Sequence, residues 1–314
     1  MPMNDLEFRT QMTGEIDKVI KHKSVTAFME DNGFKAKFVG TKEVKIPDVD
    51  MLALGDYDRE AGFAKGSVTV KNTVYSLTQD RGREFNIDRE DDDETGVANL
   101  TGEVVSEFNR TKVVPEIDGY SISKVAAVAA AQENIITTED YPIATKPYEA
   151  FDELFTKVNE ITGGGMELVA LVSYDYWAAL KKSPEIKAII NQGEFKNGEV
   201  TRIVKKIDNV SIIPVPTESM YTVYETLDGK ADTEGYAGGL VPGSGAKKIK
   251  MLMLSKDTAR RVRKLEKVKI FTPDENQDMD AWKIQERLYY DVLVKKSRRV
   301  IPHALIEDGA TPSA

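Results

Sequence analysis

The sequence predicts a fold of the α+β class, in which one long helix packs on a sheet built from distant parts of the chain. Residues 95–131 form a helical stretch in two parts, whose apolar face is narrow and rich in alanine. Runs with the alternating pattern of strands flank this helix, at residues 67–89 and again after residue 248. Residues 135–247 mix helical and strand patterns, which indicates an α/β unit inserted between the helix and the last strands.

The composition excludes several classes of protein. The 314 residues include no cysteine, which excludes disulfides, thiolate nucleophiles and zinc–thiolate sites. The only two histidines, His22 and His303, lie towards the ends of the chain, where we expect solvated or interface roles. The net charge of −9 argues against a protein that grips nucleic acid, because phosphate contacts require a basic excess. No apolar run approaches the roughly 20 residues of a membrane span, and no secretory signal is recognisable, so we expect folding in a cytoplasm.

The first sixty residues predict an arm with little core of its own. Residues 4–29 place apolar side chains at helical spacing among charges, which predicts an amphipathic helix that stands apart from the main core. Residues 42–49 form a strand-like piece that Pro47 should break. A loop is then indicated by three glycines, Gly55, Gly62 and Gly66.

Residues 67–89 predict a two-stranded hairpin. Extended runs lie on both sides of residues 79–82, whose sequence QDRG has the composition of a turn. The hairpin would bury little apolar surface by itself, and an isolated hairpin is marginally stable in water. We therefore expect it to rest on another surface, in its own chain or in a neighbouring copy.

The acidic run at residues 88–94 has two interpretations. Carboxylates at a helix N-terminus stabilise it by roughly 0.3–1 kcal/mol each, and a helix is predicted to begin at Thr95. The run could instead bind a metal ion, but it lacks the spacing of a calcium loop, so we favour the first interpretation. Pro115 should divide the helix into two parts with a kink, because proline is tolerated in a first helical turn.

In the inserted unit, residues 146–161 predict an amphipathic helix that ends at the glycines of residues 163–165. A buried strand follows at residues 166–172, and Ser173 should cap a short helix. Two further strand regions and a glycine-rich surface loop are expected at residues 200–215, 220–226 and 228–245.

After this unit, residues 248–254 predict a central strand. Ser255 and Asp257 should cap a short basic helix that extends to residue 265. Two further strands are expected at residues 268–271 and 282–294. The last segment also fits a helix, but the shared parity of its large apolar side chains favours a strand.

This order of parts resembles the major capsid proteins of tailed double-stranded-DNA phages, which have the Hong Kong ninety-seven type of fold. The most specific local matches are LTQDRGREFNIDREDDDETG and VSEFNRTKVVPEIDGYSISKVA. Both are similar to segments in capsid proteins from phages of low-GC Gram-positive bacteria. The segment YYDVLVKK, residues 289–296, resembles the long peripheral strand of that family. Together these segments carry the resemblance from about residue 60 onward.

The resemblance implies a division of the chain into domains. These are an N-terminal arm (1–60), an extended loop (61–94), a discontinuous peripheral domain (95–134 and 248–308), an axial domain (135–247) and a tail (309–314). It also implies pentamers and hexamers that form an icosahedral shell around packaged double-stranded DNA, in a virion assembled in the host bacterial cytoplasm. The expected partners are copies of the chain, a separate scaffolding protein and a portal, with weak non-specific contact with DNA and none with membranes. No catalytic residue, cofactor or metal is expected.

The residues expected to contact a neighbouring subunit are Lys71, Arg81, Arg83, Phe85, Ile87 and Arg89. The basic residues alternate with acidic ones, which suggests charge pairs between subunits, although a solvated charged face explains the pattern equally well. One relative seals its shell with Lys–Asn isopeptide bonds, and Lys71 has a suitable position for such a lysine. Nothing in the sequence fixes the asparagine or glutamate that this chemistry needs.

Three alternatives remain open. A bacterial nanocompartment shell would have the same fold, and neighbouring genes would distinguish it from a capsid. A phosphate- or nucleotide-handling enzyme could use residues 163–165, but these glycines follow a helix and precede a strand, the reverse of a phosphate loop. A monomeric adhesion or binding module would require the predicted hairpin to pack on its own chain.

Overall fold

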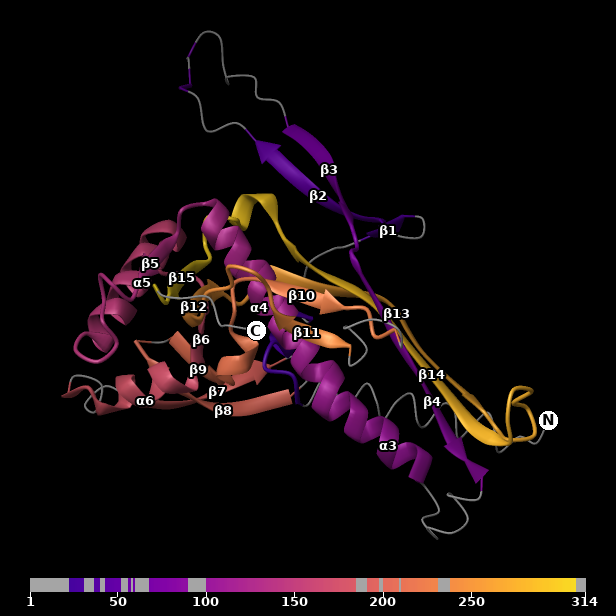
Figure 1. Cartoon of the computed structure of the whole chain (residues 1–314). Coiled ribbons are helices and arrows are strands. Elements are labelled where there is room, and N and C mark those ends of the chain that lie inside the picture. The colour runs from indigo at the N-terminus through magenta and orange to yellow at the C-terminus, as the bar shows by residue number, and fades with distance from the viewer. Residues whose placement is uncertain are drawn as a thin grey trace.

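The computed structural model describes residues 23–30, 37–39, 43–51, 56–57, 59, 68–89, 100–184, 191–197, 200–208, 210–230 and 238–308. These residues form a body of sheets and helices from which one narrow ribbon of two strands projects (Figure 1). The predicted helix at residues 4–22, the glycine loop, the acidic residues 90–94 and the beginning of the long helix lie outside the described residues.

A seven-stranded sheet in the order β5–β15–β12–β6–β9–β8–β7 forms the centre of the body. Its strands are β5 (Ile135–Thr137), β6 (Leu168–Ser173), β7 (Asn191–Asn197), β8 (Val200–Ile207), β9 (Val210–Val215), β12 (Ile249–Ser255) and β15 (His303–Ile306). β6 and β12 are buried at every position, because helices cover both faces of the sheet. The predicted strands at residues 166–172 and 248–254 are confirmed.

One face of this sheet is covered by α5 (Pro147–Thr162) and α6 (Tyr174–Lys182). Phe151 and Leu154 of α5 and Tyr176 of α6 pack on it, as the amphipathic pattern predicted. Gly163 ends α5 with a φ of 66°, which confirms its prediction as a helix end. Ser173 precedes α6 but makes no side-chain cap, because its hydroxyl donates to the carbonyl oxygen of Lys250 instead.

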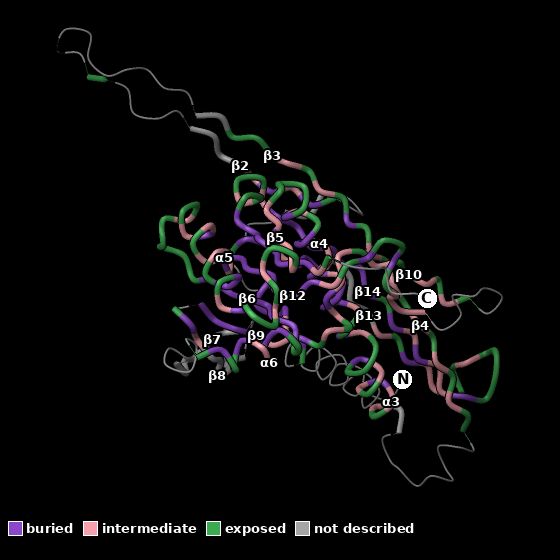
Figure 2. The backbone as a smooth tube through the Cα atoms, turned by 60° about the vertical axis from the view of Figure 1, so that its left-hand side comes forward, coloured by how far each residue is buried: buried purple, intermediate pink, exposed green. Residues whose placement is uncertain are grey.

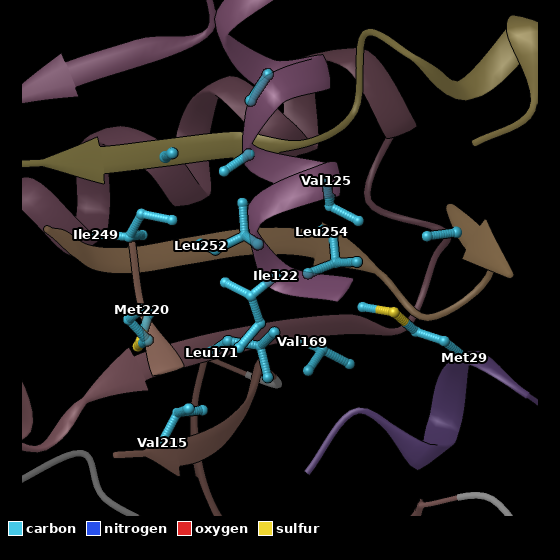
Figure 3. Packing of buried hydrophobic residues seen from close by; sticks show 14 of the residues in the cluster. Met29, Ile122, Val125, Val169, Leu171, Val215, Met220, Ile249, Leu252 and Leu254 are labelled. Carbon is cyan, nitrogen blue, oxygen red and sulfur yellow. The ribbon is translucent and has the colours of Figure 1, made fainter. Parts of the chain in front are cut away.

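The opposite face is covered by the long helix, which we call the spine. It comprises α3 (Leu100–Phe108), one π-helical stretch, η2 (Asn109–Val113), and α4 (Val114–Ala131). Ile122 and Val125 of the spine pack with Leu171 and Leu252 of the sheet (Figure 3). The predicted division at Pro115 is confirmed: the proline lies in the first turn of α4, immediately after the π-helical stretch.

A second sheet, in the order β13–β14–β4, lies along the other end of the spine (Figure 1). Its strands are β4 (Gln79–Asp88), β13 (Ala259–Phe271) and β14 (Ala281–Val294). The predicted strand at residues 282–294 is therefore confirmed. The predicted helix that should extend to residue 265 is wrong, because β13 pairs with β14 from Ala259 onward. Pairing with β14, which follows β13 after residues 272–280, overrides the local helical pattern.

The predicted hairpin at residues 67–89 is also wrong. β3 (Val68–Ser76) pairs with β2 (Glu43–Met51), whereas β4 pairs with β14. The chain passes from one sheet to the other through Leu77, which is buried at the junction. The sequence QDRG thus lies inside β4. A Cβ atom on Gly82 would lie 2.8 Å from the carbonyl oxygen of Glu286, so this glycine permits two backbones to approach rather than forming a turn.

Pro47 does not break β2, contrary to expectation. β1 (Lys37–Val39) pairs with β2 only as far as Lys45, while β3 continues alongside. Pro47 therefore lies where β2 has a neighbour on one side alone. Proline has no N–H to donate to a neighbouring strand, so it is tolerated where one side of the strand has no neighbour.

The described part of the N-terminal segment, Ser24–Glu30, is integrated into the core rather than standing apart from it. Lys23, before it, is α-helical as predicted, whereas Ser24–Glu30 contains one 3-10 turn, η1 (Ala27–Met29), in place of the predicted α-helix. Phe28 and Met29 are fully buried with the spine and the central sheet, and Figure 3 shows Met29 at the edge of this cluster.

Two further predictions need correction. The glycine-rich residues 228–245 are not simply a loop, because β11 (Gly239–Pro242) pairs with β10 (Tyr224–Leu227) as a hairpin that lies beside α4. His303 is buried in β15 rather than solvated, with its Nδ1 atom 2.9 Å from the carbonyl oxygen of Ile301, and burial lowers its pKa. His22 lies outside the described residues. In the described part of the chain, none of the helices has the length and apolar character needed to cross a membrane.

The central sheet spans the predicted limit between residues 247 and 248. β12 pairs with β6 from Met251–Val172 to Ser255–Leu168, so strands assigned to the peripheral and axial domains belong to one sheet. The domain limits inferred from the resemblance therefore remain a prediction about how the chain divides in an assembly.

Candidate assembly surface

The ribbon formed by β2 and β3 has an exposed apolar face. Val70 and Val74 are 60% and 47% exposed, and Figure 2 shows that the ribbon leaves the body here. Antiparallel pairing places Pro47 opposite Asn72 and Lys45 opposite Val74, and opposite residues share a face of a sheet. We call this set the ribbon face: Lys45, Pro47, Val70, Asn72 and Val74. Because both valines remain largely open to solvent, the described residues leave this face uncovered.

The base of the ribbon, in contrast, is fixed to the body. An apolar cluster joins the two, consisting of Val44, Ile46, Leu77, Val262, Tyr289 and Leu293. The backbone N–H and hydroxyl of Thr78 donate to Asp291 over 3.0 and 2.9 Å, and Tyr120 donates to the same carboxylate over 2.8 Å. Burial, together with the nearby Asp291 carboxylate, raises the pKa of Tyr120 to about 12, so its phenol is a donor at neutral pH.

Two of the predicted contact residues, Arg81 and Arg83, bind within their own chain. Arg81 pairs with Glu116 of the spine over 2.7 Å and donates to the carbonyl oxygens of Leu227 and Gly239. Arg83 donates to the carbonyl oxygen of Gly229 over 3.3 Å. These bonds fasten the β10–β11 hairpin to β4. The hypothesis that the two arginines also pair with a neighbouring subunit stays a prediction.

The other predicted contact residues lie in three different places. Phe85 meets Phe108 of the spine edge-on, with ring centroids 4.7 Å apart. Phe85 and Ile87 both pack against an apolar cluster between the spine and the second sheet that includes Ile117 and Leu288. Arg89 lies beyond the end of β4, with its guanidinium 3.7 Å from carboxylate oxygens of Asp274 and Asp280. Lys71 is exposed on the ribbon. The structure therefore gathers Arg81, Arg83, Phe85 and Ile87 on the spine-facing side of β4, and separates Lys71 and Arg89 from them.

The opposite side of β4 carries exposed charges that pair with β14. Asp80 pairs with Arg287 over 2.6 Å, and Glu84 accepts a hydrogen bond from Gln285 over 2.7 Å. Exposed pairs of this kind contribute about 0–1 kcal/mol each. The alternation of charge in β4 is thus explained in part by pairing along its own sheet.

A buried polar cluster, which sequence reasoning missed, holds the N-terminal segment in place. We call it the clasp: Ser24, Thr26, Glu30, Asp118, Arg261 and Arg263. Asp118 of the spine accepts hydrogen bonds from the hydroxyl of Ser24 over 2.6 Å and from the backbone N–H groups of Val25 and Thr26. The sequence contains one signal of this cluster: Asp118 lies within the apolar face of a predicted helix. An aspartate buried there requires hydrogen-bond or charged partners.

Arginines from β13 complete the clasp. Arg261 has no exposed side-chain surface and pairs with Glu30 over 2.6 Å, while Arg263 reaches the other oxygen of Glu30 over 2.8 Å. Burial opposes ionisation of Glu30, but the two guanidiniums outweigh it, and the pKa of Glu30 is lowered. The clasp thus connects the N-terminal segment, the spine and β13 through charged groups shielded from water.

Within the described residues, no three histidine or carboxylate side chains gather as a metal-binding group. His303 is buried beside a backbone carbonyl and lies in the core of the sheet, so it does not face an open cleft. The ribbon face offers two exposed apolar side chains, Val70 and Val74, to another surface.

No family model matches the chain, and no curated protein matches it. Solved structures are similar over most of its length. A capsid structure of the cyanophage P-SCSP1u has a TM-score of 0.58 at 12% identity, covering 87% of this chain and 86% of that one. A mature capsid of bacteriophage PhiM1 has a TM-score of 0.56 at 12% identity, covering 90% and 85%. A virus-like particle from Pyrococcus furiosus has a TM-score of 0.51 at 9% identity, covering 95% and 99%.

These similarities confirm the fold predicted from the sequence, since they extend over most of both chains. At such low identity they concern the fold alone. The ribbon, the spine over its sheets and the inserted helices of this chain together form the α+β fold of the tailed-phage capsid proteins, the Hong Kong ninety-seven type.

Proposed function

We propose that the chain is the structural subunit of an icosahedral phage capsid that encloses packaged double-stranded DNA. The observation that carries this proposal is the ribbon face. Val70 and Val74 remain 60% and 47% exposed on strands that project beyond the body, which places apolar side chains where another chain can cover them. A second copy that covers this face would remove the valines from solvent.

A closed ring of identical subunits requires one surface to meet a different surface on the next copy. A projecting ribbon suits such a contact, because it extends away from the core that fixes its base. Each contact can be weak, since many contacts per subunit act together in a shell. The finished shell would then be kinetically stable, because a subunit dissociates only after all its contacts break.

In this proposal the chain assembles into pentamers and hexamers and is not an enzyme. The arm (1–60) and extended loop (61–94) would contact neighbouring copies, with Lys71 and Arg89 the most accessible of the predicted contact residues. A separate scaffolding protein and a portal would take part in assembly within the host bacterial cytoplasm. The net charge of −9 favours only weak contact with the packaged DNA.

The proposal is tested by expressing the chain and examining it by size-exclusion chromatography and negative-stain electron microscopy. We expect rings or closed shells, alone or when a scaffolding protein from the same genome is co-expressed. A folded monomer of 35.0 kDa at every concentration, with and without such a protein, would contradict the proposal.

A second candidate function is the shell of a bacterial nanocompartment. It is favoured by one observation, the similarity to a virus-like particle from Pyrococcus furiosus over nearly the full length of both chains. The two functions differ in what the shell encloses. Particles isolated from the native source should contain nuclease-protected DNA in the first case and a packaged protein in the second.

A further inference from the structure

The residues that follow β14 carry a concentration of positive charge. Residues 295–299 have the sequence KKSRR, and no acidic residue occurs between Asp291 and Glu307. A short run of lysine and arginine is typical of a surface that binds a polyanion. The fold adds one more cation to this run, from the start of β13. We call the whole set the basic corner: Arg260, Lys295, Lys296, Arg298 and Arg299.

The pairing of β13 with β14 gathers the basic corner from two segments of the chain. Ala259 lies opposite Val294, the last residue of β14, so the first residues of β13 adjoin the residues that follow β14. Arg298 donates to the carbonyl oxygen of Asp257 over 2.9 Å, which joins the residues after β14 to the turn before β13. The cations of both segments therefore lie at one place on the surface of the subunit.

The subunit neutralises little of this charge. Arg298 has a carboxylate partner, Asp257, at 3.5 Å. The other four side chains of the basic corner form no ion pair within the described residues. Lys296 and Arg299 are exposed, and Arg260 and Lys295 are partly exposed. In a chain with 52 acidic and 43 basic residues, this cluster is a local excess of positive charge, which attracts a partner of negative charge.

The composition of the basic corner fits phosphate groups better than a protein surface. Protein interfaces are depleted in lysine and serine, and they have an apolar centre. Val300 beside the corner is 43% exposed, but its apolar neighbours Val294 and Ile301 are buried, so the corner has no apolar centre. Lysine, arginine and serine are the side chains that contact the DNA backbone, and Ser297 is exposed among the cations.

We propose that the basic corner contacts the phosphate backbone of the packaged double-stranded DNA. The inference rests on the proposed function, and it names the part of the subunit that meets the enclosed genome. It requires the corner to face the interior of the shell. Each subunit offers only a few cations, so each contact is weak, and contacts to phosphate carry no sequence information. Such a wall holds the DNA without fixing its register, and the DNA can move along it during packaging.

The first test measures DNA binding by the full chain under non-assembling conditions. The probe is a fluorescent duplex of about 20 base pairs, and its anisotropy is followed between about 20 and 200 mM salt. The variant is Lys295→Gln together with Lys296→Gln. The matched control is Lys181→Gln together with Lys182→Gln, which removes another pair of consecutive exposed lysines, at the end of α6. Both variants should unfold at the midpoint of the unaltered chain, since exposed substitutions change stability little.

We expect the variant of the basic corner to lose at least about fivefold in affinity at the lowest salt concentration. The slope of log affinity against log salt should become less steep by about 2, because each lost phosphate contact lowers it by about 1. The control should bind as the unaltered chain does. Equal affinities of the two variants would overturn the basic corner as the DNA site.

The same assay distinguishes DNA from an acidic protein. Poly-glutamate, added at the same concentration of charge as unlabelled duplex, should displace the labelled duplex at least about fivefold less well, because its linear charge density is lower than that of duplex DNA. Displacement by poly-glutamate that equals displacement by unlabelled duplex would identify an acidic polypeptide as the partner and overturn the proposal.

The second test asks whether the corner faces the genome. Particles from the native source are acetylated with a small lysine reagent, either filled with DNA or after the DNA has been released. We expect Lys295 and Lys296 to react at least about threefold less in filled particles, because phosphate contacts cover them. Equal reaction in filled and emptied shells would overturn this inference and leave the capsid function intact. Particles that never contain DNA would instead overturn the proposed function, and this inference with it.

Discussion

The clasp and the ribbon both hold a segment from the first part of the chain, and they differ in how their side chains are satisfied. In the clasp, the carboxylate of Asp118 and the guanidinium of Arg261 are buried, the carboxylate of Glu30 is largely shielded, and each has bonded partners. In the ribbon, Val70 and Val74 remain exposed with nothing in the described chain to cover them fully. Polar groups are thus inside and satisfied in one region, whereas apolar groups are outside and uncovered in the other.

This difference indicates what each region contributes. The clasp adds to the stability of the single subunit, because its charges are balanced only when the N-terminal segment, the spine and β13 are together. The ribbon face adds little to the subunit, since an exposed side chain gains nothing by folding. Its contribution is expected only when a partner covers it. Substitutions should therefore separate folding from assembly.

The largest loss of stability is expected from Arg261→Met, which leaves the buried carboxylate of Asp118 without its counter-charge and leaves Glu30 paired with Arg263 alone. Removal of one partner from a buried ion pair typically lowers the free energy of unfolding by about 3–5 kcal/mol. Chemical denaturation of the subunit under non-assembling conditions measures this change.

Arg287→Met is the matched control, because Arg287 pairs with Asp80 on the exposed side of the same sheet, with 60% of its side chain open to solvent. Its loss should lower stability far less than that of Arg261, because exposed ion pairs are screened by solvent. Equal effects of the two substitutions would remove the distinction between the clasp and the surface pairs.

A smaller loss is expected from Gly82→Ala, which tests whether β4 belongs to the body rather than to the ribbon. The added Cβ would lie 2.8 Å from the carbonyl oxygen of Glu286, so the backbones of β4 and β14 must separate locally. Strain of this kind lowers stability by about 1–3 kcal/mol. Gly165→Ala is the control, since a Cβ there meets no atom within 4 Å. Thermal unfolding of both variants compares them, and equal midpoints would contradict the close approach.

The clasp should also weaken in acid. The pKa of Glu30 in the folded chain is lowered below its ordinary value of 4.5 by Arg261 and Arg263, against the opposing effect of burial. Its contribution to stability is therefore present above the unfolded-state pKa and is lost as the pH falls through the folded-state pKa. Below about pH 5, Glu30→Gln should lose less stability than the unaltered chain. Urea unfolding of both proteins at pH 7 and pH 3 measures the difference. If both lose the same free energy of unfolding, Glu30 is not a source of the acid sensitivity.

The parts of the fold that sequence reasoning predicted are those whose pattern is local. The helix that became α5 has an apolar stripe and a terminal glycine, and the single parity of residues 282–294 favours a strand without reference to any partner. The fold resemblance depended on the order of such elements. The spine was predicted for the same reason, together with the effect of Pro115.

The errors concern choices between partners that lie far apart in the sequence. β3 and β4 are neighbours in the chain, yet β3 pairs with β2 and β4 pairs with β14. The local sequence marks this switch between sheets only by the buried Leu77 at their junction. The predicted helix after Ser255 failed because β14 pairs with that segment. In the candidate site, charged residues were selected for their alternation, whereas the exposed valines of the ribbon were taken as ordinary strand residues.

The smallest effect on folding is expected from Val70→Asp together with Val74→Asp, and here the two regions should differ most clearly. Exposed substitutions usually change stability by about 0.5 kcal/mol or less, so the subunit should unfold as before. Assembly should fail, because two carboxylates would have to leave water at the contact. Val300→Asp is the control, since this valine is 43% exposed on another part of the body. Electron microscopy and unfolding curves of the same preparations decide the matter. Loss of stability equal to that of Arg261→Met would mean that the ribbon face is covered within the subunit, whereas intact shells would mean that it is not a contact.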